Sequence, residues 1–217
     1  MTDGVIIFLI TQTVAFIIAI FKIYVQVTVK MRELELRVEQ NEQKDNIIFK
    51  KLDNIVLVIG KTEGHIDQSL FARNILDEKN GPPPEINLFN EKNNGETLLK
   101  LINSGLIKSA HDVSVGGIIT AVSKMCIKGN KGINLKKPKY LINEIEYYFA
   151  EDQGRYIIEV SKNSLKKVTD ILVKNAVHFD ELGTINEDQL FINEKTKVTI
   201  DELRTSNTNW LTNYMSK

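Results

Sequence analysis

The sequence predicts an α+β or layered α/β fold, in which a globular domain follows a transmembrane helix and a short coiled coil. Three observations support this. Residues 5–21, within the first part (1–30), are almost wholly apolar. Residues 31–54 carry an apolar seam of helical spacing, and residues 55–217 alternate short apolar runs with amphipathic stretches. Interleaved strand and helix patterns are typical of a sheet covered by helices. We therefore expect three parts with these boundaries.

The first part predicts a membrane helix. Residues 5–29 form a weakly polar stretch with one charge, Lys22, and only positions 11–13 interrupt the apolar run over residues 5–21. As a helix this stretch would be about 37 Å long, enough to cross a hydrocarbon core of about 30 Å. A cleaved signal peptide is disfavoured because residues 1–4 carry no positive charge and no small-residue cleavage site stands out. The alternative is an apolar helix buried in a soluble partner.

The charges that flank this stretch predict its orientation. Asp3 precedes it, whereas Lys30, Arg32 and Arg37 follow it. Positive residues favour the cytoplasmic side of a membrane. We therefore expect a single pass through the inner (cytoplasmic) membrane, with the N-terminus outside and the C-terminal domain in the cytoplasm.

A seam of alternating four- and three-residue spacings continues from Val27 to Ile55. Such spacing is typical of a coiled coil, which would make the chain a homo-oligomer. Asn41 and Asp45 interrupt the seam, and Asp45 would repel its copy in a parallel dimer. A solvated linker helix explains the pattern equally well.

Composition limits the possible partners and sites. The chain of 217 residues has 28 basic and 28 acidic side chains, so no overall field favours nucleic acid. The single cysteine, Cys126, cannot form an internal disulfide and is expected to pack as a small buried hydrophobe, which suits a reducing compartment. His65, His111 and His178 are too isolated in the sequence for a zinc-type pattern.

The globular part begins with a buried strand over 54–59, then a loop from Gly60 to Ser69, where a short helix starts. Glycines and hydroxyls in such a loop suit a phosphate. An ordinary strand–helix turn is the alternative. The candidates in this loop are Gly60, Thr62, Gly64 and Ser69.

A stiff connector at 82–84 leads to a predicted helix over 85–103, with Leu88, Leu98, Leu99 and Ile102 facing inward. A strand over 106–110 and a helix from about residue 117 follow. The expected buried face of this helix consists of Ile118, Ile119, Ala121, Val122 and Met125. Residues 129–139 are expected to form a lysine-rich surface loop.

The turn between the strand over 106–110 and the helix from about residue 117 carries residue types suited to ligand binding. Paired glycines at a helix start allow backbone N–H groups to approach a phosphate, and the helix dipole favours negative charge there. The alternative is a turn in which Ser114 merely caps the helix. The candidate residues of this turn are His111, Asp112, Ser114, Gly116 and Gly117.

Apolar spacing also predicts the remaining elements, of which the last helix begins with Asp201 as its cap. The expected elements are a helix-like stretch over 140–149, a strand over 155–160, a helix over 162–176, strands over 179–185, 190–192 and 198–200, and a helix over 201–214.

Residues 109–117, Ser-Ala-His-Asp-Val-Ser-Val-Gly-Gly, resemble the His-Asp-Val-Ser-Asp-Gly-Gly signature of the phosphoribosylformylglycinamidine synthases, in the aminoimidazole ribonucleotide synthetase-like superfamily. The resemblance implies a C-terminal-type domain of this superfamily. Further stretches that carry it are 54–60, 64–70, 81–88, 151–156, 198–204 and 210–215.

The resemblance implies a part in de novo purine biosynthesis, in the ATP- and glutamine-dependent amidation of formylglycinamide ribonucleotide. It implies ATP or ADP with Mg²⁺, with Asp112 as a metal ligand and the other candidates of both loops as phosphate or nucleotide contacts. Three departures from the family's pattern weaken this expectation of nucleotide and metal binding. Lys61 stands where the family has Glu, Asp67 where it has Gly, and Val115 where it has Asp. A carboxylate in a phosphate-binding turn repels the ligand, and valine cannot coordinate a metal.

The family places its ATP site at an interface with N-terminal-type domains, for which we find no counterpart in residues 1–54. We therefore expect a fragment that is inactive unless another polypeptide supplies those domains. The resemblance also implies that Glu151–Gln153 forms part of a site wall, whereas the residues alone favour a solvated turn. The alternative function is a non-catalytic, membrane-anchored oligomeric scaffold or ligand-binding protein.

Overall fold

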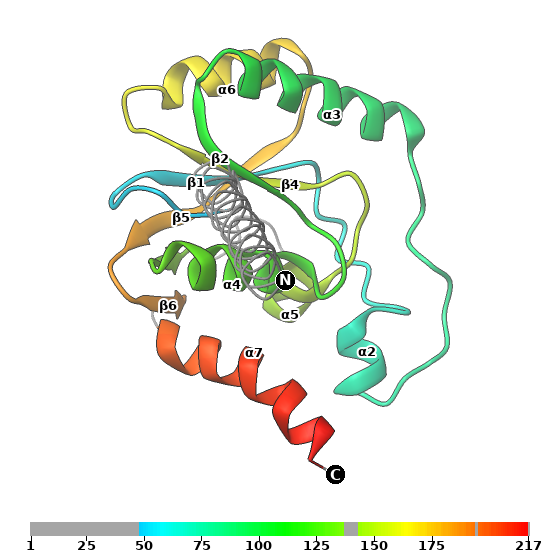
Figure 1. Cartoon of the computed structure of the whole chain (residues 1–217). Helices are drawn as coiled ribbons and strands as arrows, with labels where there is room; N and C mark the ends of the chain where they lie inside the picture. Colours follow the sequence, from blue (N-terminus) through cyan, green and yellow to red (C-terminus); the bar gives the residue numbers. More distant parts are fainter. Residues whose placement is uncertain (1–47, 137–142, 194, 217) are drawn as a thin grey trace, which may run out of the picture. The chain divides into compact units, whose positions relative to one another are not determined.

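The computed structural model describes residues 48–136, 143–193 and 195–216 (Figure 1). The predicted transmembrane helix, and the predicted coiled coil up to residue 47, lie outside the described residues. Among the residues that are described, no helix has the length and apolar character needed to cross a membrane.

A seven-stranded sheet forms the centre of the described fold, in the order β2-β4-β1-β5-β3-β6-β7. Neighbouring strands are antiparallel, except that β3 and β6 are parallel. The mixed sheet confirms the α+β character that the sequence predicts. The strands are β1 (Ile55–Ile59), β2 (Ile107–Asp112), β3 (Gly132–Leu135), β4 (Tyr156–Val160), β5 (Phe179–Asn186), β6 (Gln189–Ile192) and β7 (Thr196–Thr199).

Helices cover both faces of the sheet, with α3 and α6 on one face and α4 and α5 on the other (Figure 1). This arrangement gives the layered architecture. The helices are α2 (Leu70–Asn74), α3 (Leu88–Asn103), α4 (Gly117–Gly129), α5 (Glu144–Phe149), α6 (Leu165–Lys174) and α7 (Ile200–Met215).

Strand β1 separates the two cores. Val56 and Val58 pack into the cluster that contains α4 and α5, whereas Leu57 and Ile59 pack into the cluster that contains α3 and α6. Successive side chains of a strand point to opposite faces, so a strand covered on both sides is apolar throughout. All five residues of β1 are buried, as the uninterrupted apolar run predicts.

Strand β3 is a feature that the sequence reading missed. The lysine-rich stretch expected to be a surface loop places Gly132–Leu135 inside the sheet, between β5 and β6. Its two apolar side chains, Ile133 and Leu135, are buried. A Cβ atom at Gly132 would collide with Gln189 and Asn186. Four residues with lysines on both sides provide too short an apolar pattern to show this strand.

Helix α3 turns a different face to the core from the one expected. Leu88 is 76% exposed and Leu99 is 57% exposed, so both expected inward positions are wrong, and Ile102 is also exposed. The residues that do face inward are Asn94, Thr97, Leu98 and Leu101. Asn94 is suited to burial because its side-chain amide donates to the carbonyl oxygen of Gly154 at 2.9 Å.

Helix α7 begins with a capping box at Thr199, not with a cap at Asp201. The Glu202 N–H donates to Thr199 Oγ1 (3.2 Å), and the Thr199 N–H donates to Glu202 Oε2 (2.7 Å). Hydrogen bonds from Thr199 lower the pKa of the Glu202 carboxyl group. Asp201 lies in the first turn and pairs with Arg204 at 2.8 Å.

The segment before β1 is held by a buried carboxylate. Although the sequence predicts a helix up to residue 54, residues 48–54 form bends and turns. Glu159, fully buried in β4, accepts from the backbone N–H groups of Lys50 (2.8 Å) and Lys51 (3.0 Å) and from Asn54 Nδ2 (2.6 Å). Ser109 Oγ donates to the same carboxylate at 3.1 Å. This segment is therefore fastened to the centre of the sheet.

Candidate functional site

The turn with the paired glycines connects β2 to α4. Strand β2 continues to Asp112, so His111 and Asp112 lie at the end of the strand rather than in the turn. Gly116 and Gly117 have φ angles of +84° and +69°, values that favour glycine. A Cβ atom at Gly117 would lie 2.6 Å from the carbonyl oxygen of Ala150, so this position also lacks space for a side chain.

Ser114 is exposed and does not cap α4. The N-cap position belongs to Gly116, and no side chain caps the helix. Ser114 contributes only its backbone carbonyl, which accepts from the Gly117 N–H at 3.0 Å. Its hydroxyl group has no hydrogen-bond partner within the described parts of the chain. The hydroxyl is therefore available to a ligand.

His111 and Asp112 form a local pair. His111 Nδ1 lies 3.1 Å from Asp112 Oδ1 and 2.6 Å from the Asp112 carbonyl oxygen. Since both oxygens are acceptors, this geometry places a proton on Nδ1. The His111 side chain is nearly buried, whereas the Asp112 side chain is 65% exposed. The His111 imidazole thus holds in position the Asp112 carboxylate, which faces solvent.

Glu151 connects this turn to the start of α2. Its Oε1 atom accepts from the backbone N–H groups of Gly116 and Leu70, both at 2.8 Å. Both amides belong to helix starts, where a carboxylate is favoured. The position that the sequence assigns to a phosphate at Gly116 is thereby contacted by a carboxylate of the chain itself.

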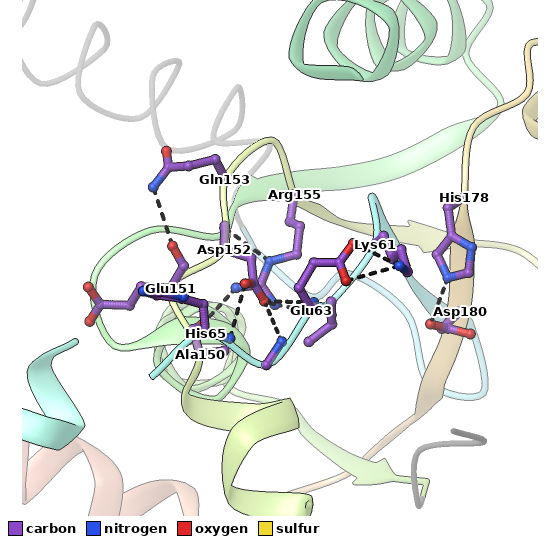
Figure 2. Close-up of polar contacts among 12 residues, drawn as sticks. Lys61, Glu63, His65, Ala150, Glu151, Asp152, Gln153, Arg155, His178 and Asp180 are labelled. Carbon is purple, nitrogen blue, oxygen red and sulfur yellow. Dashed lines mark hydrogen bonds and ion pairs between the residues drawn. The ribbon is translucent and has the colours of Figure 1, made fainter. Parts of the chain in front are cut away.

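Asp152 is buried and holds the loop after β1, as Figure 2 shows. Its carboxylate accepts from three consecutive backbone N–H groups, those of Glu63 (3.0 Å), Gly64 (3.1 Å) and His65 (3.2 Å). The residues alone favoured a solvated turn for Glu151–Gln153. That expectation is wrong for Asp152, because its hydrogen-bond partners lie 87–89 residues earlier in the chain.

Arg155 completes this arrangement beneath the loop (Figure 2). Its guanidinium group is fully buried and donates to the carbonyl oxygens of Ala150 (2.7 Å) and Asp152 (3.1 Å) and to Thr62 Oγ1 (3.1 Å). Burial lowers the pKa of Arg155, and the nearby Asp152 carboxylate opposes that shift. Sequence reasoning did not select Arg155. The signal that could have found it is a lone arginine directly before an apolar strand and three residues after Asp152.

The four candidates of the first loop are engaged within the fold. The Gly60 N–H donates to the His178 carbonyl oxygen at 2.8 Å, and the Gly64 N–H donates to Asp152. Thr62 is buried against Arg155. Ser69 is fully buried and caps α2, because its hydroxyl accepts from the Ala72 N–H at 3.1 Å. The fold therefore uses these residues to shape the loop.

A pocket of about 230 Å³ lies beside the turn of residues 113–117 between β2 and α4, which we call the signature turn. Asp112 lines it from the end of β2, and Ser114 and the exposed Val115 line it from the turn. Three carboxylates face this pocket, whereas its one cation, Arg155, is paired with Asp152. Burial, followed by Glu91 and Asp112, raises the pKa of Tyr156 in the same wall. The other lining residues are Glu91, Val113, Glu151, Gln153, Gly154, Arg155 and Tyr156.

A larger cavity of about 840 Å³ shares Glu91 and Gln153 with this pocket. It lies between the loop after β1 and the connector that leads into α3, and it includes Gly60, His65 and His178. Thus Asp112, Ser114 and Val115 gather at the smaller pocket, whereas Gly60 lies at the larger cavity.

The described part of the chain contains no group of three or more His, Cys, Asp or Glu residues that could hold a metal ion. Asp112 fits a magnesium site only as a single exposed carboxylate. Mg²⁺ in nucleotide sites commonly takes one or two protein carboxylates together with phosphate oxygens and water. A metal at this turn would need such additional ligands.

Known proteins are similar to this chain in sequence. The phosphoribosylformylglycinamidine synthase subunit PurL of Pelagibacter ubique (strain HTCC1062) is 75% identical over 167 residues, which cover 77% of this chain and 23% of that protein. The PurL subunit of Bartonella bacilliformis is 35% identical over 162 residues, covering 75% of this chain and 22% of that protein. The chain therefore spans less than a quarter of the length of these relatives.

Solved structures share the fold. Thermotoga maritima PurL complexed with FGAR matches 72% of this chain and 28% of its own chain, with a TM-score of 0.61 and 19% identity. The complex of the same protein with ATP matches with a TM-score of 0.55 and 18% identity, over 72% of this chain and 26% of that chain.

A family model described as "AIR synthase related protein, C-terminal domain" matches residues 53–193, which contain the sheet from β1 to β6, the signature turn, Glu151, Asp152 and Arg155. This chain belongs to the family of AIR synthase related protein C-terminal domains.

Proposed function

We propose that this chain acts in purine biosynthesis as one domain of a phosphoribosylformylglycinamidine synthase, in the ATP- and glutamine-dependent amidation of formylglycinamide ribonucleotide. The observation that carries the proposal is the 75% identity with a PurL subunit over 167 residues. The signature turn supports it, since Asp112 and Ser114 face the pocket beside α4.

The part of this domain in the reaction is to bind a phosphorylated ligand, a nucleotide or the substrate. Ser114 donates through its exposed hydroxyl group, Asp112 receives a metal, and His111 keeps the Asp112 carboxylate in place. Gly116 and Gly117 shape the turn beside the ligand, because their backbone N–H groups donate to Glu151 Oε1 and to the Ser114 carbonyl oxygen. Gly60, Thr62, Gly64 and Ser69, predicted as ligand contacts, act chiefly by shaping the neighbouring loop.

Charge favours a ligand that arrives with magnesium. Glu91, Asp112 and Glu151 line the pocket and repel a bare phosphate. Mg²⁺ bound to ATP or ADP would offset this repulsion, with Asp112 supplying one oxygen and the phosphates supplying others. Val115, which stands where the family has Asp, makes the dependence on Asp112 greater.

A partner polypeptide is part of the proposal, because the chain spans only 23% of the length of the Pelagibacter relative. Phosphoryl transfer needs groups placed on several sides of the γ-phosphate. The structure of PurLQS from Thermotoga maritima, which matches this fold, is a precedent for work in a multi-subunit assembly. We propose that a second chain supplies the remaining domains.

The test is complementation in trans. The Pelagibacter PurL protein would be shortened by the region that matches this chain, and the full chain would be added separately. We expect amidation of formylglycinamide ribonucleotide to return in the presence of the enzyme's other subunits. Failure to restore activity, while intact PurL is active in the same assay, would contradict the proposal.

Two matched variants refine the assay. Asp112→Asn removes the carboxylate beside the pocket and should lower both the restored activity and the binding of ADP with Mg²⁺, measured by isothermal titration. Asp170→Asn makes the same change at an exposed position of α6, outside both cavities, and should alter neither the restored activity nor the binding. Equal effects of the two changes would show that Asp112 has no place in the site.

We also propose that residues 1–30 anchor the chain in the inner membrane, with the N-terminus outside. The support is the apolar run and the positive charges after it. Membrane fractions washed with alkaline carbonate should retain the full chain. Its release into the wash would contradict the proposed anchor.

A further inference from the structure

The sequence contains two Asn-Gly pairs, Asn80-Gly81 and Asn94-Gly95, which the fold places in opposite environments. In such a pair the glycine nitrogen can attack the asparagine side-chain carbonyl, because glycine has no side chain to obstruct the approach. We propose that Asn80 is a site of spontaneous deamidation and isoaspartate formation, whereas Asn94 is protected. This modification is independent of the proposed function.

The reaction uses only water. The Gly81 backbone nitrogen forms a bond to Cγ of Asn80, and the side-chain amide leaves as ammonia together with the proton of the Gly81 N–H. Water then opens the succinimide at one of its two carbonyl groups and returns a proton to the nitrogen. One opening gives aspartate, and the other gives isoaspartate, in which the side-chain methylene has entered the main chain.

Asn80 lies exposed in the irregular connector between α2 and α3. Gln68 Nε2 holds the carbonyl oxygens on either side, of Lys79 at 2.8 Å and of Gly81 at 3.1 Å. Within the described residues, neither the Asn80 side chain nor the Gly81 N–H has a hydrogen-bond partner. The two reacting groups are therefore free to meet in the folded protein.

Asn94 lacks that freedom. It lies in the middle of α3 and is buried, and its side-chain nitrogen donates to the Gly154 carbonyl oxygen at 2.9 Å. The Gly95 nitrogen belongs to the helix backbone, so attack on the side chain requires local unfolding of α3. Helix opening has a free-energy cost that slows any reaction of the open form.

The product at Asn80 does not fit the native connector. Gly81 has a φ angle of +104°, and a Cβ atom there would lie 2.5 Å from Cγ of Asp67. A lengthened main chain disturbs this close approach of the Gly81 backbone to Asp67, and the new carboxylate adds a negative charge to the connector. Pro82, the next residue, contacts His65 Nε2 through its carbonyl oxygen at 2.9 Å. Deamidation should therefore loosen the connector beside the larger cavity.

The experiment follows both pairs in one sample. The purified full chain would be incubated in mildly alkaline buffer and then digested at mildly acidic pH with a protease that cleaves after glutamate. The peptides 79–85 and 92–96 each contain one Asn-Gly pair. Mass spectrometry measures deamidation in each peptide, and methylation by an isoaspartate methyltransferase identifies the isoaspartyl form. A parallel sample in concentrated urea serves as the unfolded control.

In the folded protein we expect conversion of peptide 79–85 to be at least about tenfold faster than that of peptide 92–96, the factor given by an opening free energy of about 1.4 kcal/mol. In urea the two rates should converge. An Asn80→Gln variant should lose the modification of the connector alone, because glutamine cannot form the five-membered ring. Equal rates in the folded protein, or a connector peptide that stays intact, would overturn the proposal.

Discussion

The carboxylate of Asp152 and the guanidinium group of Arg155 form a buried ion pair, with Nη1 and Oδ2 3.7 Å apart, beneath the loop that follows β1. Both side chains have further hydrogen bonds. Asp152 accepts from three backbone amides of the loop, and Arg155 donates to two carbonyl oxygens and to Thr62. The loop that the sequence assigns to a phosphate is thus organised around the buried carboxylate of Asp152.

The substitution Asp152→Asn should destabilise the fold strongly. It leaves the buried Arg155 charge without its carboxylate and presents an amide group to backbone donors. Removing one partner of a buried pair costs about 3 kcal/mol or more. Urea unfolding followed by circular dichroism measures the loss. Asp170→Asn on α6 is the control and should change the unfolding free energy by less than about 0.5 kcal/mol. Similar losses in the two variants would contradict this role.

Glu159→Gln should release the segment before β1. The carboxylate accepts four hydrogen bonds, whereas a glutamine has one acceptor oxygen and would direct its NH₂ group at some of the same donors. We expect a loss of about 2 kcal/mol, together with faster hydrogen exchange at Lys50 and Lys51. Exposed Glu187→Gln should have little effect. Unchanged exchange at these amides would show that Glu159 does not hold the segment.

Gly117→Ala and Gly105→Ala separate backbone strain from lack of space. The φ angles are similar, +69° and +66°. A Cβ atom at Gly105 meets nothing within 4 Å, whereas at Gly117 it would meet three backbone atoms within 2.8 Å. The strain alone should cost about 1 kcal/mol at Gly105, and the overlap should add about 1–3 kcal/mol at Gly117. Equal melting temperatures of the two variants would contradict this account.

The stability of the domain should fall at alkaline pH partly because of Tyr148. Burial, followed by the charge of Glu144, raises the pKa of Tyr148 to about 12, and its hydroxyl group lies 2.9 Å from the Lys136 carbonyl oxygen. The folded state then binds this proton more tightly than the unfolded state, whose tyrosine has a pKa of about 10. The stability from this group is complete below pH 10 and is lost as the pH rises toward 12.

The variant Tyr148→Phe tests this prediction. Between about pH 10 and 12 its unfolding free energy should depend less steeply on pH than that of the wild type. Tyr214→Phe, at an exposed position of α7, should leave the slope unchanged. In a spectroscopic titration of the folded protein, Tyr148→Phe should remove one of the phenols that ionise above pH 10. Identical slopes in wild type and Tyr148→Phe would contradict the assignment.

Sequence alone was sufficient where a local pattern carried the whole signal. The five apolar residues of β1 predicted a buried strand. Helix α4 buries four residues of its predicted inner face, Ile118, Ala121, Val122 and Met125, with Cys126 beside them, whereas the fifth, Ile119, is partly buried. The signature turn was found because its paired glycines and polar residues are adjacent in the chain. Each of these features depends on periodicity or residue type within a few positions.

Tertiary structure decided the features whose partners are distant in sequence. Asp152 is buried because the amides of residues 63–65 surround it, Glu159 because it fastens the segment that precedes β1, and Asn94 because it reaches Gly154. Strand β3 exists because β5 and β6 pair with it on either side. Hydrophobic pattern cannot show these positions, since a polar residue enters a core only when a remote group satisfies it. The sequence alone determined the family-like turn and the apolar framework. Only folding determined which carboxylates are buried and accept hydrogen bonds from distant backbone N–H groups.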